Sequence, residues 1–228
     1  MPDESFGWPW DHVKTPDGWP PCHKEEIVGE VLRGRIYDGV PIGGVVVDAG
    51  ANVGVITSVL RQEAQHVYAI EADPVVYAVL DDNRKRLGWD NVSTHCFALA
   101  GYSGFATLYR TARDPLISSI TQLWEGESVR VPAITLDSFM DEFGIERIDL
   151  LKLDIEGAEA GILLGDTFPS AASRISRILV ECHRFPDGYS APLDRLVTLG
   201  FREVIRLPQQ TYLPAMHLYE KEITEHAR

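Results

Sequence analysis

Three short stretches of the chain place charged side chains directly after apolar runs, an arrangement that suits the binding of a small ligand. They cover residues 45–55, 150–159 and 178–183, and each begins as the Val-, Leu- or Ile-rich segment that is typical of a buried parallel strand. In an open α/β sheet, ligands bind outside the carboxyl ends of such strands. The three stretches therefore predict one shared site.

The first stretch predicts a turn that binds the nucleoside part of a cofactor. It reads Gly50-x-Asn52-x-Gly54, whereas a dinucleotide turn reads G-x-G-x-x-G and needs its second glycine for close approach of a pyrophosphate. Asn52 at that position disfavours NAD and FAD, and no G-x-x-x-x-G-K-[ST] sequence for a P-loop is present. Glu71 ends the next apolar run, 21 residues after Gly50. An acid there can accept hydrogen bonds from ribose hydroxyls, the alternative being a solvated acid at a strand end.

The second stretch ends in three acids, Asp154, Glu156 and Glu159. Asp154 is predicted to face the same crevice as Asp48 and Gly50, because the strands that carry them should be neighbours. Carboxylates around one crevice suit a cationic ligand or a metal ion. Glu156 and Glu159 have a second interpretation as acids that favour the first turn of a helix, which we prefer for Glu159.

The third stretch ends in Glu181, Cys182 and His183. Imidazole titrates near neutral pH and is the usual general base, so His183 is a candidate for catalysis or substrate contact, with a structural role as the alternative. We expect no metal ion. If a divalent ion is used, Asp154 and Glu181 are the candidate ligands.

Strands and helices alternate along the chain, which predicts an α/β fold with right-handed crossovers. Two strands at 106–110 and 129–134 break the rhythm, separated by about 18 residues that include Ser118 and Ser119. Such a long connection is usually functional or disordered. The other strands are predicted over 44–48, 66–71, 92–97, 148–154, 177–183, 201–205 and 215–220, and the helices over 24–35, 52–63, 74–87, 137–143, 156–164 and 192–199.

Residues 1–43 are predicted to be an N-terminal extension with one helix, ahead of a catalytic domain over 44–228. Residues 1–23 hold three tryptophans and five prolines, which blocks regular structure. They form either an extended segment pinned to the domain by its aromatic side chains or a lid over the substrate, in which Trp10 would contact the substrate.

Composition narrows the class of partner. The 228 residues carry a net charge of −13 without a dense basic block, which argues against nucleic acid. No apolar run reaches the roughly 20 residues of a membrane span, and the acidic N-terminus does not resemble a signal peptide. The three cysteines are far apart, as expected for reduced thiols in a cytoplasm. We expect a small-molecule partner and leave a homodimer open.

Four motifs together resemble the FkbM-type methyltransferases, which are class I enzymes dependent on S-adenosylmethionine. They are Asp48-Ala49-Gly50-Ala51-Asn52-Val53-Gly54, Thr135-Leu136-Asp137-Ser138-Phe139, Lys152-x-Asp154-Ile155-Glu156-Gly157-Ala158-Glu159 and Val180-Glu181-x-His183. The resemblance covers residues 44–185. It implies a Rossmann-like, seven-stranded, mostly parallel sheet, whose last strand is antiparallel and lies between strands five and six. A β insertion between strands three and four goes with it.

The resemblance also implies roles for individual residues. The cofactor, S-adenosylmethionine with S-adenosylhomocysteine as product, would contact Asp48, Gly50, Asn52 and Gly54 at its methionine end, Glu71 at the ribose, Ala72 and Asp73 at the adenine, and Ala98, Ser119 and Asp154 elsewhere. Independently of the resemblance, we expect the acceptor to contact Trp10, Glu156, Glu181 and His183.

The expected reaction is O-methylation of a small-molecule hydroxyl on a sugar, polyketide or other secondary metabolite. It would proceed by in-line displacement, with His183 as base and Asp154 as an orienting or second base. The alternatives are an adenosine-cofactor-binding oxidoreductase and a non-catalytic nucleoside-binding module.

Overall fold

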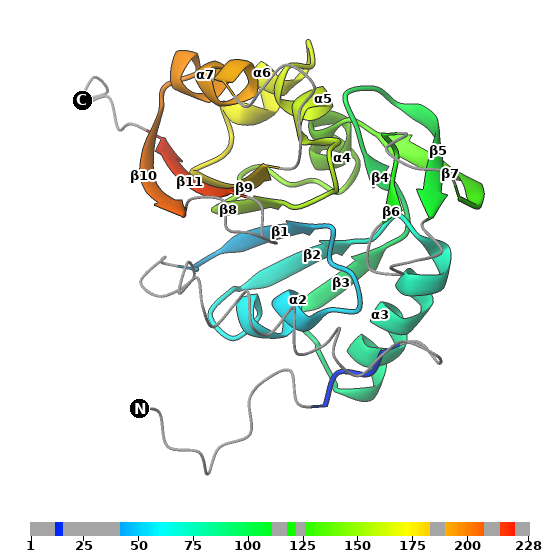
Figure 1. The fold of residues 1–228 in the computed structure, drawn as a ribbon. Coiled ribbons are helices and arrows are strands. Elements are labelled where there is room, and N and C mark those ends of the chain that lie inside the picture. The colour runs from blue at the N-terminus through cyan, green and yellow to red at the C-terminus, as the bar shows by residue number, and fades with distance from the viewer. Residues whose placement is uncertain are drawn as a thin grey trace.

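The computed structural model describes residues 12–15, 42–110, 118–121, 126–182, 190–207 and 215–221. Its centre is a seven-stranded sheet with the spatial order β10-β11-β9-β8-β1-β2-β3 (Figure 1). The strands are β1 Val45–Ala49, β2 His66–Ile70, β3 Val92–His95, β8 Leu150–Leu153, β9 Arg177–Cys182, β10 Phe201–Leu207 and β11 Ala215–Lys221.

Strand β11 runs antiparallel to both of its neighbours, β9 and β10, while the other pairs in this sheet are parallel. The last described strand, β11, thus lies between the fifth and sixth strands of the sheet. This confirms the predicted mostly parallel Rossmann-like sheet. It also confirms that β1 and β8, which carry the first two candidate stretches, are neighbours.

Helices cover both faces of the sheet, as the apolar runs predict (Figure 1). They are α2 Val55–Leu60, α3 Pro74–Arg86, α4 Leu136–Glu142, α5 Glu159–Leu163, α6 Phe168–Ala172 and α7 Ser190–Thr198. Successive side chains of a strand point to opposite faces, so Val46 packs in one buried cluster with Leu60 and Leu80, and Val47 in the other with Phe139 and Leu163.

A second sheet has the order β4-β7-β5-β6 and comes from the chain between β3 and β8, which confirms the predicted β insertion. Its strands are β4 Ala98–Leu99, β5 Gly104–Arg110, β6 Ser118–Ser119 and β7 Ser128–Ile134. The two predicted strands are the long pair, β5 and β7. The short β4 and β6 were missed because two residues are too few to show a period.

Several predicted boundaries were wrong for local reasons. The helix expected from residue 52 begins at Val55, because Asn52 and Gly54 have left-handed φ values of 52° and 94°. The helix expected from 156 begins at Glu159, because Glu156 has φ 55°. Helix α6 was not predicted, and the third strand ends at His95 rather than at 97.

One boundary was predicted correctly in its chemistry. Asp73 is the N-cap of α3, its side chain accepts a hydrogen bond from the Val75 N–H, and Pro74 occupies the first helical position. Of the predicted N-terminal extension, residues 12–15 and 42–43 are described, while the helix over 24–35 and the three tryptophans lie outside the described residues. In the described part of the chain, no helix has both the length and the apolar character to cross a membrane.

Candidate active site at the carboxyl ends of β1 and β8

The turn after β1 and the loop after β8 lie against each other. The Asp154 N–H donates to the Ala49 carbonyl at 3.2 Å, which extends the ladder between the two strands by one bond. Gly50 has φ 78°, and a Cβ at this position would lie 1.7 Å from the Asp154 carbonyl oxygen. Glycine is therefore required at 50 both for its backbone conformation and for this close approach.

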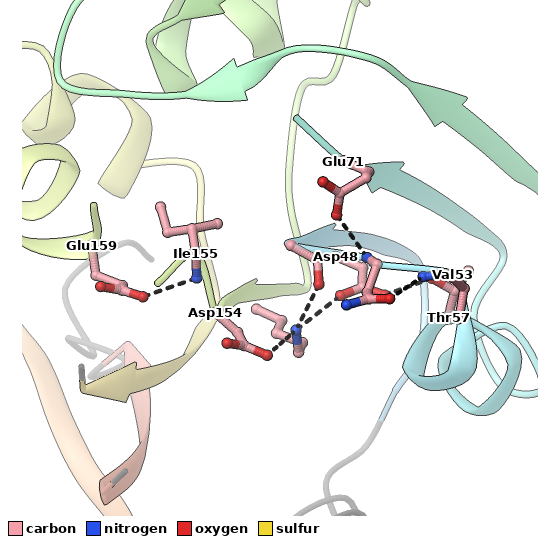
Figure 2. A network of polar contacts seen from close by, with 10 residues as sticks. Asp48, Val53, Thr57, Glu71, Asp154, Ile155 and Glu159 are labelled. Atoms are coloured by element: carbon pink, nitrogen blue, oxygen red, sulfur yellow. Dashed lines mark hydrogen bonds and ion pairs between the residues drawn. The ribbon is translucent and has the colours of Figure 1, made fainter. Parts of the chain in front are cut away.

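A buried lysine joins the two segments, and sequence reasoning gave it no role. The Lys152 ammonium lies 2.9 Å from Asp154 Oδ2, 3.3 Å from Asp48 Oδ1 and 3.4 Å from the Gly50 carbonyl oxygen (Figure 2). The Lys152 side chain is only 2% exposed, and that of Asp154 is 25% exposed. Because the position lies inside an apolar strand pattern, the only available signal was a charge where a Leu or Val belongs.

Asp48 is completely buried at the end of β1. Its Oδ2 accepts a 2.6 Å hydrogen bond from the Thr57 hydroxyl of α2, and its Oδ1 makes no hydrogen bond to any described residue. The carboxylate therefore holds the start of the turn by its contacts with Thr57 of α2 and with Lys152. Its contact with the methionine end of a cofactor stays a prediction.

Asn52 takes a left-handed conformation, which Asn adopts more readily than most residues with a side chain. Its Oδ1 accepts a bond from the Val53 N–H at 2.7 Å, and its own N–H donates to Glu71 Oε2 at 2.9 Å (Figure 2). The residue that departs from the dinucleotide pattern thus adopts the left-handed conformation of its turn and links the turn to the acid after β2.

Glu71 is 7% exposed, so the alternative of a solvated strand-end acid is wrong. Burial raises the pKa of Glu71 to about 7, although hydrogen bonds from the Asp73 and Asn52 N–H groups act in the opposite direction. These two bonds, at 2.7 and 2.9 Å, occupy one lone pair on each carboxylate oxygen. The Ala72 N–H acts on the same carboxylate, whose two oxygens have four lone pairs in all, so the group can still accept a hydroxyl donor.

The inserted sheet is fastened to this side of the site by an ion pair. Arg110, the last residue of β5, donates from Nε and Nη2 to Asp73 at 2.5 and 2.7 Å. This two-point contact raises the pKa of Arg110. Ala72, the other predicted adenine neighbour, packs partly buried against the apolar face of the inserted sheet, where Ala98 of β4 also lies.

The inserted sheet also reaches the acid loop after β8. The Ser119 hydroxyl donates to the Glu156 carbonyl at 2.5 Å, and the Thr121 hydroxyl donates to the Gly157 carbonyl at 3.3 Å. The loop itself is held by Glu159, which is completely buried and accepts the Ile155 and Gly157 N–H groups at 2.9 Å each. This geometry supports the structural interpretation of Glu159. Ser119 lies beside the loop that follows Asp154.

Of the remaining residues predicted to contact the acceptor, the structure describes only some. Glu181 is 7% exposed near the end of β9, while His183 and Trp10 lie outside the described residues. Within the described ranges, no three His, Cys, Asp or Glu side chains are grouped so as to hold a metal ion. The roles of Glu156, Glu181, His183 and Trp10 toward an acceptor stay predictions.

The site now has a glycine turn, a buried acid after the second strand and an acidic loop after the fourth, in a seven-stranded mixed sheet. The family described as methyltransferase FkbM domain matches residues 48–212, more than half of the chain. The chain belongs to the FkbM methyltransferase family. The match covers every described residue of the predicted site, and it confirms the resemblance drawn from the motifs.

Two curated relatives and one solved structure illustrate the similarity. Methyltransferase 1 of Beauveria bassiana is 27% identical over 165 residues, which cover 62% of this chain and 66% of that protein. The AMB antimetabolite synthetase AmbE of Pseudomonas aeruginosa is 26% identical over 210 residues, 73% of this chain but 10% of the synthetase. The crystal structure of methyltransferase FkbM from Methylobacillus flagellatus shares the fold with a TM-score of 0.53 and 17% identity, over 78% of this chain and 44% of that one.

Proposed function

We propose that this FkbM family member uses S-adenosylmethionine to methylate a hydroxyl oxygen of a small molecule. The observation that carries the proposal is Glu71, a buried acid after β2 whose two carboxylate oxygens are acceptors and which accepts the Asn52 N–H of the glycine turn. A ribose presents two adjacent hydroxyl donors, which match that acceptor pair.

The charges beside the turn also fit this cofactor. Lys152 contributes one positive charge, and Asp48 and Asp154 contribute two negative charges within 3.3 Å of it. The formal sum is one negative charge, and Asp154 is the more exposed of the two acids. A cationic sulfonium is favoured near this group, whereas the pyrophosphate of NAD or FAD is not. When bound, the cofactor supplies an activated methyl group on a good leaving group.

The work left to the chain is to orient the acceptor and remove its proton. Asp154, whose Oδ2 lies 2.9 Å from the Lys152 ammonium, is our candidate for orienting the acceptor hydroxyl. His183 follows β9, beside β8 in the sheet, and is our candidate base. Glu156, Glu181 and Trp10 are our candidates for acceptor contacts. The synthetase named among the relatives supports a biosynthetic small molecule as acceptor.

Binding and turnover test the proposal separately. Calorimetric titration with S-adenosylhomocysteine, NAD and ATP should show binding of the first alone. Tight binding of NAD alone would replace the proposal with an oxidoreductase. Incubation with methyl-labelled cofactor and a panel of hydroxylated metabolites should then give a labelled product, whereas binding without any product would favour a non-catalytic module.

The base assignment has its own test. His183→Ala should lower turnover by about 100-fold or more, the usual contribution of a general base, while S-adenosylhomocysteine affinity stays within about twofold. A turnover equal to that of wild type at every pH between about 6 and 9 in this variant would contradict the assignment. The cytoplasmic location and the homodimer also stay predictions.

A further inference from the structure

A four-residue segment near the N-terminus lies beside α3, far from it in sequence. We call residues 12–15 the N-terminal strap, and Figure 1 shows it in dark blue next to α3. Val13 of the strap is 4% exposed and belongs to the same buried cluster as Val53, Leu80 and Trp89. The strap is therefore packed into the core on the face that carries α2 and α3.

One buried amide joins the strap to the cofactor turn. Asn83 of α3 is completely buried, its Oδ1 accepts the Lys14 N–H at 2.9 Å, and its Nδ2 donates to the Lys14 carbonyl at 2.9 Å. The same Nδ2 donates to the Val53 carbonyl at 3.0 Å, and Arg86 Nη2 donates to Oδ1 at 2.8 Å. These four bonds satisfy the full hydrogen-bonding capacity of the amide. Asn83 thus pairs with Lys14 as a neighbouring strand would, and holds Val53 with its second donor.

Val53 lies between Asn52 and Gly54, the two residues of the cofactor turn that contact its supports. Asn52, directly before it, donates to Glu71, and Gly54, directly after it, lies where a Cβ would come 2.9 Å from Leu80 Cδ1. The turn is consequently held on one side by Glu71 and on the other by α3. Asn83 is the hydrogen-bonding member of that second support, and the strap fixes its orientation.

We propose that the N-terminal strap is a positioning element of the cofactor site, which acts through Asn83 on the turn over residues 50–54. The cofactor named here rests on the proposed function, whereas the coupling of strap to turn does not. Loss of the strap should loosen the Val53 carbonyl and the Asn52–Glu71 bond, and so weaken cofactor binding without changing the chemical step. The contact between the strap and Asn83 thus gives the N-terminal extension a role other than that of a lid.

Two variants break the link from opposite ends. Lys14→Pro removes the N–H that donates to Asn83, and Lys14→Ala is its matched control because both backbone bonds remain. Lys14→Ala does remove the ion pair between the Lys14 ammonium and Asp82, which is exposed and 3.4 Å long. Exposed ion pairs contribute little to stability. Asn83→Asp keeps the acceptor oxygen but replaces the donor nitrogen with a second oxygen. This oxygen would face the Lys14 and Val53 carbonyl oxygens without a hydrogen to donate to them.

The first measurement is amide hydrogen exchange of peptides over residues 50–57 in the full chain without ligand. Exchange should be about threefold to tenfold faster in Lys14→Pro and Asn83→Asp than in wild type, and unchanged in Lys14→Ala. The second is calorimetric titration with S-adenosylhomocysteine at a temperature at which circular dichroism shows every variant folded. Its Kd should rise by about fivefold to tenfold in the two variants, the loss expected for a hydrogen bond in a support.

The outcomes separate the two proposals. If wild type does not bind S-adenosylhomocysteine, the proposed function fails, and the exchange comparison still decides whether the strap holds the turn. Unchanged exchange in both variants overturns the coupling. Faster exchange with an unchanged Kd, or a lower melting temperature alone, shows a support for stability only and overturns the role in positioning the cofactor site.

Discussion

Raising the pH from about 5 to about 8 should ionise Glu71, the acid buried between the cofactor turn and α3. In the folded chain, burial raises the pKa of Glu71 from 4.5 to about 7. The unfolded chain releases this proton near pH 4.5, whereas the folded chain keeps it until about pH 7. The stability contributed by the protonated group is therefore fully present below about pH 4.5 and is lost as the pH rises through about 7.

The size of this effect follows from the two pKa values. A difference between 4.5 and about 7 corresponds to about 3 kcal/mol in the free energy of unfolding, at about 1.4 kcal/mol per unit. Cofactor affinity should change in the opposite direction, because in the proposed function the ribose hydroxyls donate to the ionised carboxylate. The S-adenosylhomocysteine Kd should rise by up to about tenfold for each pH unit below 7.

Urea denaturation and calorimetry at matched pH values check both trends. Glu71→Gln cannot ionise, so the difference between wild type and this variant isolates Glu71 from all other titrating groups. Exposed Glu63→Gln is the matched control and should follow wild type. A stability difference between wild type and Glu71→Gln that does not vary over this range would refute the reasoning. So would an affinity that falls as the pH rises through 7.

Two further substitutions test the supports of the site. Lys152→Met should cost about 3–5 kcal/mol in the free energy of unfolding, because it leaves the buried Asp48 carboxylate without its cation. Adding Asp48→Asn to the same chain should recover part of this loss. Additive losses of the two substitutions in urea denaturation would contradict the pairing. Gly50→Ala should abolish S-adenosylhomocysteine binding in calorimetry, since a Cβ would lie 1.7 Å from the Asp154 carbonyl oxygen. Gly88→Ala is the control and should still bind, because Gly88 has a comparable φ of 62° but no atom lies within 4 Å of the added Cβ.

Patterns within short stretches were enough to predict the fold and the edge of the sheet that carries the site. The Val-rich run ending at Asp48, the glycine turn and the acid at 71 predicted β1, β2 and their common ligand edge, because buried parallel strands and tight turns leave local signals in residue type. The Asp73-Pro74 pair predicted the start of α3 for the same reason. The motif over 152–159 identified the family.

The supports of the site were decided by the tertiary structure. Lys152 contacts a carbonyl 102 residues away, and Asn83 pairs with a backbone 69 residues away. Nothing in local spacing reports such contacts, since they depend on which strands are neighbours, in which register, and on which helix covers which face. Glu159 shows the same limit, because its side chain closes on a loop whose shape is set by a left-handed Glu156. Sequence determined most of the longer elements and the sheet edge at which we expect a ligand, because secondary-structure preference and periodicity are local. Tertiary structure decided which buried polar groups hold that site together, because each must find its partner wherever the fold places one.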